Sequence, residues 1–70
     1  MRYRELAKRL RKMGCKYIRP GAGSHRIWWN PALDRYTTIP DWGRKDIKPG
    51  TLSRILRDLG ISRRDFGPIK

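Results

Sequence analysis

The stretch best suited to chemistry is Gly21-Ala22-Gly23-Ser24-His25, which holds the only histidine of the 70-residue chain. Histidine is the residue type whose ordinary pKa, about 6.5, lies closest to neutrality. Glycines before it let a phosphate backbone approach closely and present N–H groups to an anion. His25 is therefore the first candidate for proton transfer, with Gly23 and Ser24 as candidate phosphate contacts. The alternative is a polar histidine at a strand start without a catalytic role, exposed or bonded to a backbone carbonyl.

The charge of the chain predicts a polyanionic partner. Eighteen Lys and Arg residues against six Asp and Glu give a formal net charge of +12. Such a surface attracts polyanions and releases their counterions, so nucleic acid is the leading candidate. The alternatives are a membrane surface, a charge that serves solubility alone, and a strongly acidic protein partner. The basic candidates for RNA contact are Lys16, Arg19, Arg26, Arg44 and Lys45.

The chain offers little for a metal or a cofactor. One cysteine, Cys15, and one histidine fall short of the four ligands of a closed zinc site, and a lone cysteine forms no internal disulfide. No apolar run approaches the ~20 residues of a membrane span, and no signal-peptide core follows the first residues. We therefore expect no metal, no cofactor and no membrane association, and a reducing, cytoplasmic location.

Two helices and three strands are predicted. Apolar residues recur at helical spacing over residues 3–13, Glu5 precedes Arg9 at ion-pair spacing, and Gly14 ends this helix. Residues 15–19, 24–30 and 36–39 are rich in strand formers and separated by turn residues. Pro49 begins a second helix with a clear apolar stripe, which Gly60 ends, and residues 62–65 resemble a capping box for one more turn.

This order predicts an α+β fold, αβββα with a short extra turn, in a single domain of residues 1–70. Consecutive strands on short turns form an antiparallel meander, and both helices need the same sheet face to bury their apolar stripes. Side chains alternate along the second strand, so one face carries His25, Ile27 and Trp29. The opposite face carries Arg26, Trp28 and Asn30. Which of the two tryptophans enters the core is left open at this point.

The aromatic residues have two interpretations. Trp and Tyr commonly fill a small core, but they also stack on unpaired bases, each stack contributing roughly 1–3 kcal/mol. The residues concerned are Tyr17, Trp28, Trp29, Tyr36 and Trp42. Trp42 is the strongest candidate for stacking because it lies in the loop after Pro40.

Three blocks of sequence resemble the HicA (YcfA-like) toxin family. They are Gly23-Ser24-His25-Arg26-Ile27, Thr38-Ile39-Pro40, and Lys48-Pro49-Gly50-Thr51-Leu52 continued by Ile55-Leu56 and Leu59-Gly60-Ile61. The resemblance implies a fold similar to the double-stranded RNA-binding domain, an mRNA-cleaving toxin with its essential histidine at His25, and a neutralising, acidic HicB-type antitoxin. Many members carry a second histidine shortly after the third strand, where this chain has Asp41-Trp42-Gly43.

Three hypotheses follow from the sequence. The first is a metal-independent endoribonuclease toxin with His25 as its acid–base residue. The second is a non-catalytic RNA-binding module of similar fold, and the third is an inactive subunit that uses its basic surface to hold an acidic protein. Loss of RNA cleavage in His25→Ala distinguishes the first hypothesis from the other two.

Overall fold

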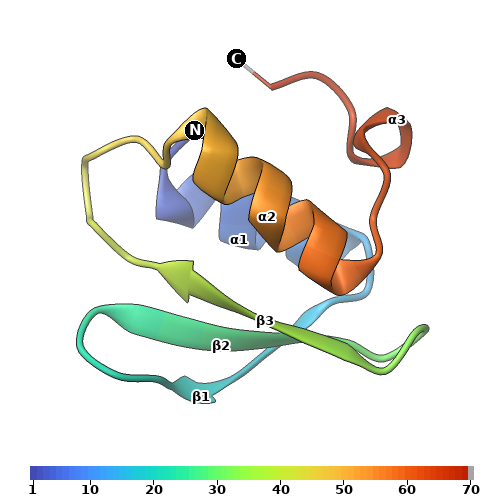
Figure 1. The fold of residues 1–70 in the computed structure, drawn as a ribbon, viewed down its shortest axis with the longest axis horizontal. Helices are drawn as coiled ribbons and strands as arrows, with labels where there is room; N and C mark the ends of the chain where they lie inside the picture. The colour runs from blue at the N-terminus through green and yellow to red at the C-terminus, as the bar shows by residue number, and fades with distance from the viewer. Residues whose placement is uncertain (70) are drawn as a thin grey trace.

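The computed structural model describes residues 1–69, and Lys70, the last residue of the predicted domain, lies outside the described residues. The elements follow in the order α1 (Tyr3–Lys12), β1 (Lys16–Pro20), β2 (His25–Asn30), β3 (Arg35–Pro40), α2 (Pro49–Leu59) and α3 (Arg63–Phe66). Figure 1 shows α1 and α2 packed together over one side of the sheet, with α3 beside the end of α2. The predicted α+β fold class is confirmed, and each predicted strand is found within one residue of its expected bounds.

The sheet is an antiparallel meander with β2 at its centre. Along β2 and β3 the directly opposed pairs include His25 with Pro40, Ile27 with Thr38, and Trp29 with Tyr36. The pairing of β1 with β2 contains an irregularity between Tyr17 and Arg19, which leaves Ile18 as the extra residue. His25 is thereby placed at the first position of the central strand.

The core lies between the sheet and the helices. Burial decides between the two tryptophans, since Trp28 is fully buried while Trp29 is partly exposed on the other face. Trp28 donates its Nε1–H to the Tyr3 hydroxyl at 3.1 Å and meets the Tyr17 ring edge-on. The other buried apolar side chains come mainly from the helices: Leu6, Ala7, Leu10, Leu52, Ile55, Leu56 and Leu59.

Both long helices end on glycine as predicted. The Gly14 N–H donates to the Arg11 carbonyl and the Cys15 N–H to the Leu10 carbonyl, the two bonds of a Schellman end. Gly60 ends α2 in the left-handed conformation with φ of 71°. Ser62 then caps α3 by accepting the Asp65 N–H, so the predicted capping turn is confirmed as well.

Two details differ from expectation. Among the described residues Glu5 and Arg9 form no ion pair, because Arg9 instead donates to the carbonyls of Phe66 and Pro68 and lies over the Phe66 ring. The segment between β3 and α2 is a loop as predicted, but Ile47 within it is buried in the core. Its N–H donates to the Met1 carbonyl, which ties the loop to the start of the chain.

Candidate functional site

His25 is exposed and is anchored to the turn that precedes it. Gly23 takes a φ of 59° within this turn, and the His25 N–H closes the turn on the Ala22 carbonyl at 3.1 Å. The ring Nδ1 lies 3.0 Å from the same carbonyl oxygen. Since a carbonyl only accepts, we assign the ring proton to Nδ1, which leaves Nε2 as the basic nitrogen of the neutral ring.

The turn before His25 also presents backbone donors. Within residues 1–69 the N–H groups of Gly23 and Ser24 meet no protein acceptor. Their positions in a tight turn, one of them at positive φ, resemble the concave backbone arrangements that bind anions. The two predicted phosphate contacts therefore lie directly before the histidine.

The loop after β3 is joined to this turn. The Asp41 N–H donates to the Ser24 carbonyl at 2.9 Å, and the Asp41 carboxylate pairs with the Arg26 guanidinium at 3.5 Å. Arg26 follows the alternation of the strand and lies on the helix-facing side of the sheet, away from His25. This arginine holds the loop in place, and its own exposure is only intermediate.

The face of the sheet away from the helices carries His25 and several of the other candidates. We call it the open sheet face and define it by the side chains that alternation and pairing place there: Lys16, Arg19, His25, Ile27, Trp29, Tyr36 and Thr38. Lys16 and Arg19 are exposed on the edge strand β1, opposite Trp29 and Ile27. Two of the predicted basic contacts thus share a face with the histidine.

The loop candidates form a second group. Trp42 is 39% exposed and lines a hollow of about 400 Å³ with Lys45, Asp46 and Lys48. Arg44 lines another hollow, of about 430 Å³, with Arg2, Tyr3, Arg4, Asp41 and Gly43. Arg4 was not among the predicted contacts. The start of the chain reaches this loop through the pairing of Arg2 with Asp46 and through the bond from the Ile47 N–H to the Met1 carbonyl.

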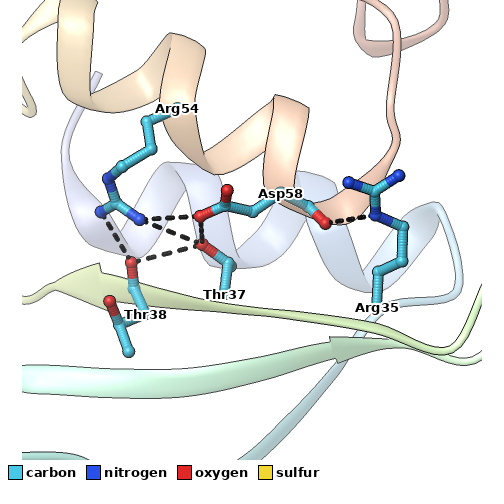
Figure 2. Close-up of polar contacts among 5 residues, drawn as sticks. All are labelled: Arg35, Thr37, Thr38, Arg54 and Asp58. Carbon is cyan, nitrogen blue, oxygen red and sulfur yellow. Dashed lines mark hydrogen bonds and ion pairs between the residues drawn. The ribbon is translucent and has the colours of Figure 1, made fainter.

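A polar network joins α2 to the outer edge of β3 (Figure 2). Arg54 pairs with Asp58 at 2.9 Å and donates to the Thr38 carbonyl at 3.0 Å. The Thr37 hydroxyl donates to Asp58, and Arg35 donates through Nε to the Asp58 carbonyl at 2.7 Å. Arg54 is therefore largely committed to holding α2 on the sheet.

Burial changes the acidity of two side chains in the core. It raises the pKa of the Cys15 thiol, which keeps this group protonated and poorly nucleophilic, as expected for a small buried hydrophobic residue. Burial also raises the pKa of Tyr3, against the opposing effect of the hydrogen bond from Trp28. Neither group belongs to the open sheet face.

No three His, Cys, Asp or Glu side chains within residues 1–69 lie close enough together to hold a metal ion. No helix there has the length and apolar character needed to cross a membrane.

The fold and the site together define a small, strongly basic α+β protein with an exposed histidine beside a glycine-rich turn. Residues 3–61 match the family model described as the HicA toxin of bacterial toxin-antitoxin systems, and the chain belongs to this family. The family resemblance expected from the three sequence blocks is confirmed. Comparison with curated proteins and with solved structures gave no match, so the likeness to the double-stranded RNA-binding domain stays a prediction.

Membership of this family assigns a general role. The chain is a toxin of a bacterial toxin–antitoxin system, and such a system pairs the toxin with an antitoxin. The matched range includes His25 and both long helices and ends before α3.

Proposed function

We propose that this toxin is a metal-independent endoribonuclease that cleaves mRNA in the cytoplasm, with His25 as its acid–base residue. The observation that carries the proposal is the orientation of His25, whose Nδ1 is held by the Ala22 carbonyl at 3.0 Å. With the ring proton assigned to Nδ1, Nε2 of the neutral ring is free to accept a proton. The family match supports a toxin, and the net charge of +12 supports a polyanionic target.

The reaction uses the RNA's own 2′-hydroxyl as the nucleophile. Nε2 of His25 takes the 2′-hydroxyl proton, and the 2′-oxygen forms a bond to the adjacent phosphorus. The bond from phosphorus to the 5′-oxygen of the next nucleotide breaks, and that oxygen takes up a proton from solvent. The products are a 2′,3′-cyclic phosphate and a 5′-hydroxyl, and no step requires a metal ion.

Negative charge develops on the phosphate as the new bond forms. General base catalysis contributes about 10²–10⁴-fold, so fixed donors and cations must supply the rest of the stabilisation. The N–H groups of Gly23 and Ser24 precede His25, and Arg19 is the nearest cation along the open sheet face. Trp42, Arg44 and Lys45 would bind RNA beyond the cut, from the loop that Asp41 joins to the turn.

We further propose that a HicB-type antitoxin with an acidic surface neutralises the toxin. A protein of opposite charge gains both attraction and a fast association rate against so basic a surface. The antitoxin would act by covering the surface around His25.

The test compares the parent protein with His25→Ala on a labelled mRNA fragment in the presence of a chelator. We expect the parent to cut and His25→Ala to lose at least about 10²-fold in rate, since it lacks the general base. Arg64→Ala is the matched control, because Arg64 is an exposed residue of α3 outside the proposed site. Far-ultraviolet circular dichroism checks that each variant is folded.

Three results would overturn parts of the proposal. Undiminished cutting by His25→Ala rejects the role of His25. Cutting that stops when the chelator is added rejects the metal-independent mechanism. RNA binding without cutting by the parent protein favours the alternative of a non-catalytic RNA-binding module.

A further inference from the structure

We infer that the open sheet face binds single-stranded RNA, with one unpaired base stacked on Tyr36 and a neighbouring phosphate held by Arg19. This inference rests on the proposed function, because it supplies the path by which an RNA strand reaches His25. The proposed stacking residue is thus Tyr36 on the open sheet face, whereas the sequence favoured Trp42 in the loop after β3.

The aromatic pair on this face is already ordered, with Tyr36 exposed and Trp29 partly exposed. Trp29 and Tyr36 are directly opposed across β2 and β3, with ring centroids 6.0 Å apart and planes at 21° to each other. The Trp29 Nε1–H donates to Asp34 Oδ1 at 2.9 Å, which fixes the indole. Tyr36 is 56% exposed, so most of its surface stays available to a ligand. A base that stacks here meets rings that need little further ordering.

Support of the hairpin alone explains only part of this arrangement. A cross-strand aromatic pair stabilises two strands by roughly 0.2–1 kcal/mol. That contribution does not involve the exposed surface of Tyr36, which lines the same hollow as Arg19. Sheets that bind single-stranded RNA use exposed aromatic side chains in this way, because every base has a flat face to stack.

The surface next to Tyr36 is hollowed, and the carboxylate in the lining of this hollow is paired. A shallow hollow of about 460 Å³ runs over the sheet to α2, and its lining includes Arg19, Ile27, Tyr36, Thr38, Arg54 and Asp58. Asp58 is neutralised by Arg54 at 2.9 Å. Arg19 forms no ion pair within residues 1–69, so its charge is available for a phosphate.

The spacing along β2 connects the hollow to the histidine. His25 and Trp29 are four residues apart on the same face, about 13 Å at the usual rise of a strand. The pair of Ile27 and Thr38 lies between them and forms the floor. The stacked base therefore belongs to a nucleotide other than the one that reacts at His25. A duplex cannot make this contact, since its bases are already paired and stacked.

The experiment measures RNA binding with proteins that carry His25→Ala, so that the RNA stays intact. A short labelled RNA of unstructured sequence is compared with the same RNA annealed to its complement. In this background Tyr36→Leu removes the aromatic ring, and Tyr36→Phe keeps it as the matched control. We expect Tyr36→Leu to weaken single-strand binding about 5- to 140-fold, the equivalent of one base stack, and Tyr36→Phe to leave it within about twofold.

Two further comparisons test the phosphate contact and the choice of strand. Arg19→Gln should lower the slope of log affinity against log salt by about 0.7, while Arg64→Gln on α3 leaves the slope unchanged. The duplex should bind more weakly than the single strand and should respond equally to Tyr36→Leu and Tyr36→Phe. Equal single-strand binding by these two variants, or a duplex preferred to the single strand, overturns the inference and leaves this face to a protein partner.

The outcome is separable from that of the proposed function. If the parent cuts RNA while Tyr36→Leu binds RNA normally, the enzyme assignment stands and the inferred stacking on Tyr36 is wrong. If the parent does not cut RNA while single-strand binding depends on the ring of Tyr36, the inferred stacking stands and the enzyme assignment is wrong.

Discussion

At the scale of single residues, His25 depends on a neighbour three positions earlier. The Ala22 carbonyl accepts both the backbone N–H and the ring Nδ1 of His25, so the same turn sets the position and the tautomer of the side chain. The sequence suggested the histidine and the glycines around it. A bond from this histidine to a backbone carbonyl was anticipated, but its double contact with Ala22 was not, because that contact depends on how the turn closes.

Cys15 provides a test of the core at the same scale. It is 2% exposed and burial raises its pKa, so the folded protein should react with iodoacetamide only through unfolding. We expect the alkylation rate at pH 8 to be at least about 10²-fold below that of the protein in denaturant, measured by mass spectrometry. A rate close to that of the denatured protein would contradict the buried position.

The raised pKa also predicts how stability depends on pH. The unfolded chain loses the thiol proton near the ordinary value of 9.0, whereas the folded protein keeps it. This contribution to stability is complete below that pH and is lost as pH rises through the folded pKa. The free energy of unfolding should therefore fall more steeply above pH 9 in the parent than in Cys15→Ala, as measured by urea denaturation.

At the scale of elements, the helix ends were the most predictable feature. Gly14, Gly60 and Ser62 take the positions expected of them, because capping depends on residues close together in the sequence. The orientation of Trp28 and Trp29 was harder to predict, since both residues are good strand formers. Only the packing of α1 and α2 on one face decides which of them is buried.

Long-range polar contacts were not predictable for the same reason. The Glu5–Arg9 spacing suggested an ion pair, but Arg9 is instead engaged by the carbonyls of Phe66 and Pro68, far along the chain. Arg54 shows the reverse case: it forms contacts with β3 that no spacing in the sequence indicated. The sequence does not show whether an arginine side chain is free or engaged in contacts within the folded protein.

Gly60 gives a prediction at this scale. Its φ is 71°, and a Cβ added there would lie 2.5 Å from Leu33 Cδ1 and 3.2 Å from Arg35 Cδ. Gly60→Ala should therefore destabilise the protein by about 1–2 kcal/mol, measured by chemical denaturation, because alanine is strained at this positive φ, while the exposed Leu33 side chain can move aside.

Gly50 is the matched control for this change. It lies in the first turn of α2 without positive φ, and a Cβ there would meet nothing within 4 Å. Gly50→Ala should be neutral or stabilise by up to about 1 kcal/mol through helix propensity. Equal destabilisation by both variants would show that the end of α2 imposes no special demand on residue 60.

At the scale of the whole molecule, seventeen of the eighteen Lys and Arg residues belong to residues 1–69, which form a body with extents of 27 × 27 × 19 Å. At 0.01 M ionic strength the screening length is about 30 Å, so all of these charges repel one another. At 0.15 M it is about 8 Å, and the repulsion becomes local. Folding concentrates the charge, so salt should stabilise the folded state.

This predicts opposite effects of sodium chloride on two measurements. Between these ionic strengths the Tm should rise by several degrees in thermal denaturation, while RNA affinity should fall in the same buffers through the loss of counterion release. Sucrose at matched osmolality is the control, because it leaves the charge interactions unscreened. A Tm independent of salt would show that the cations are too dispersed to oppose folding.

The contacts of Arg54 also affect how the protein behaves at high concentration. A three-stranded sheet has two edges, and open edges promote association between copies of a protein. On β3 the Thr38 carbonyl is occupied by Arg54, and Pro40 has no N–H to offer. On β1 the edge carries Lys16, Arg19 and Pro20, which discourage pairing between like-charged strands. Both edges of the sheet are thus protected against pairing with another copy, so the toxin should resist aggregation when no antitoxin is bound.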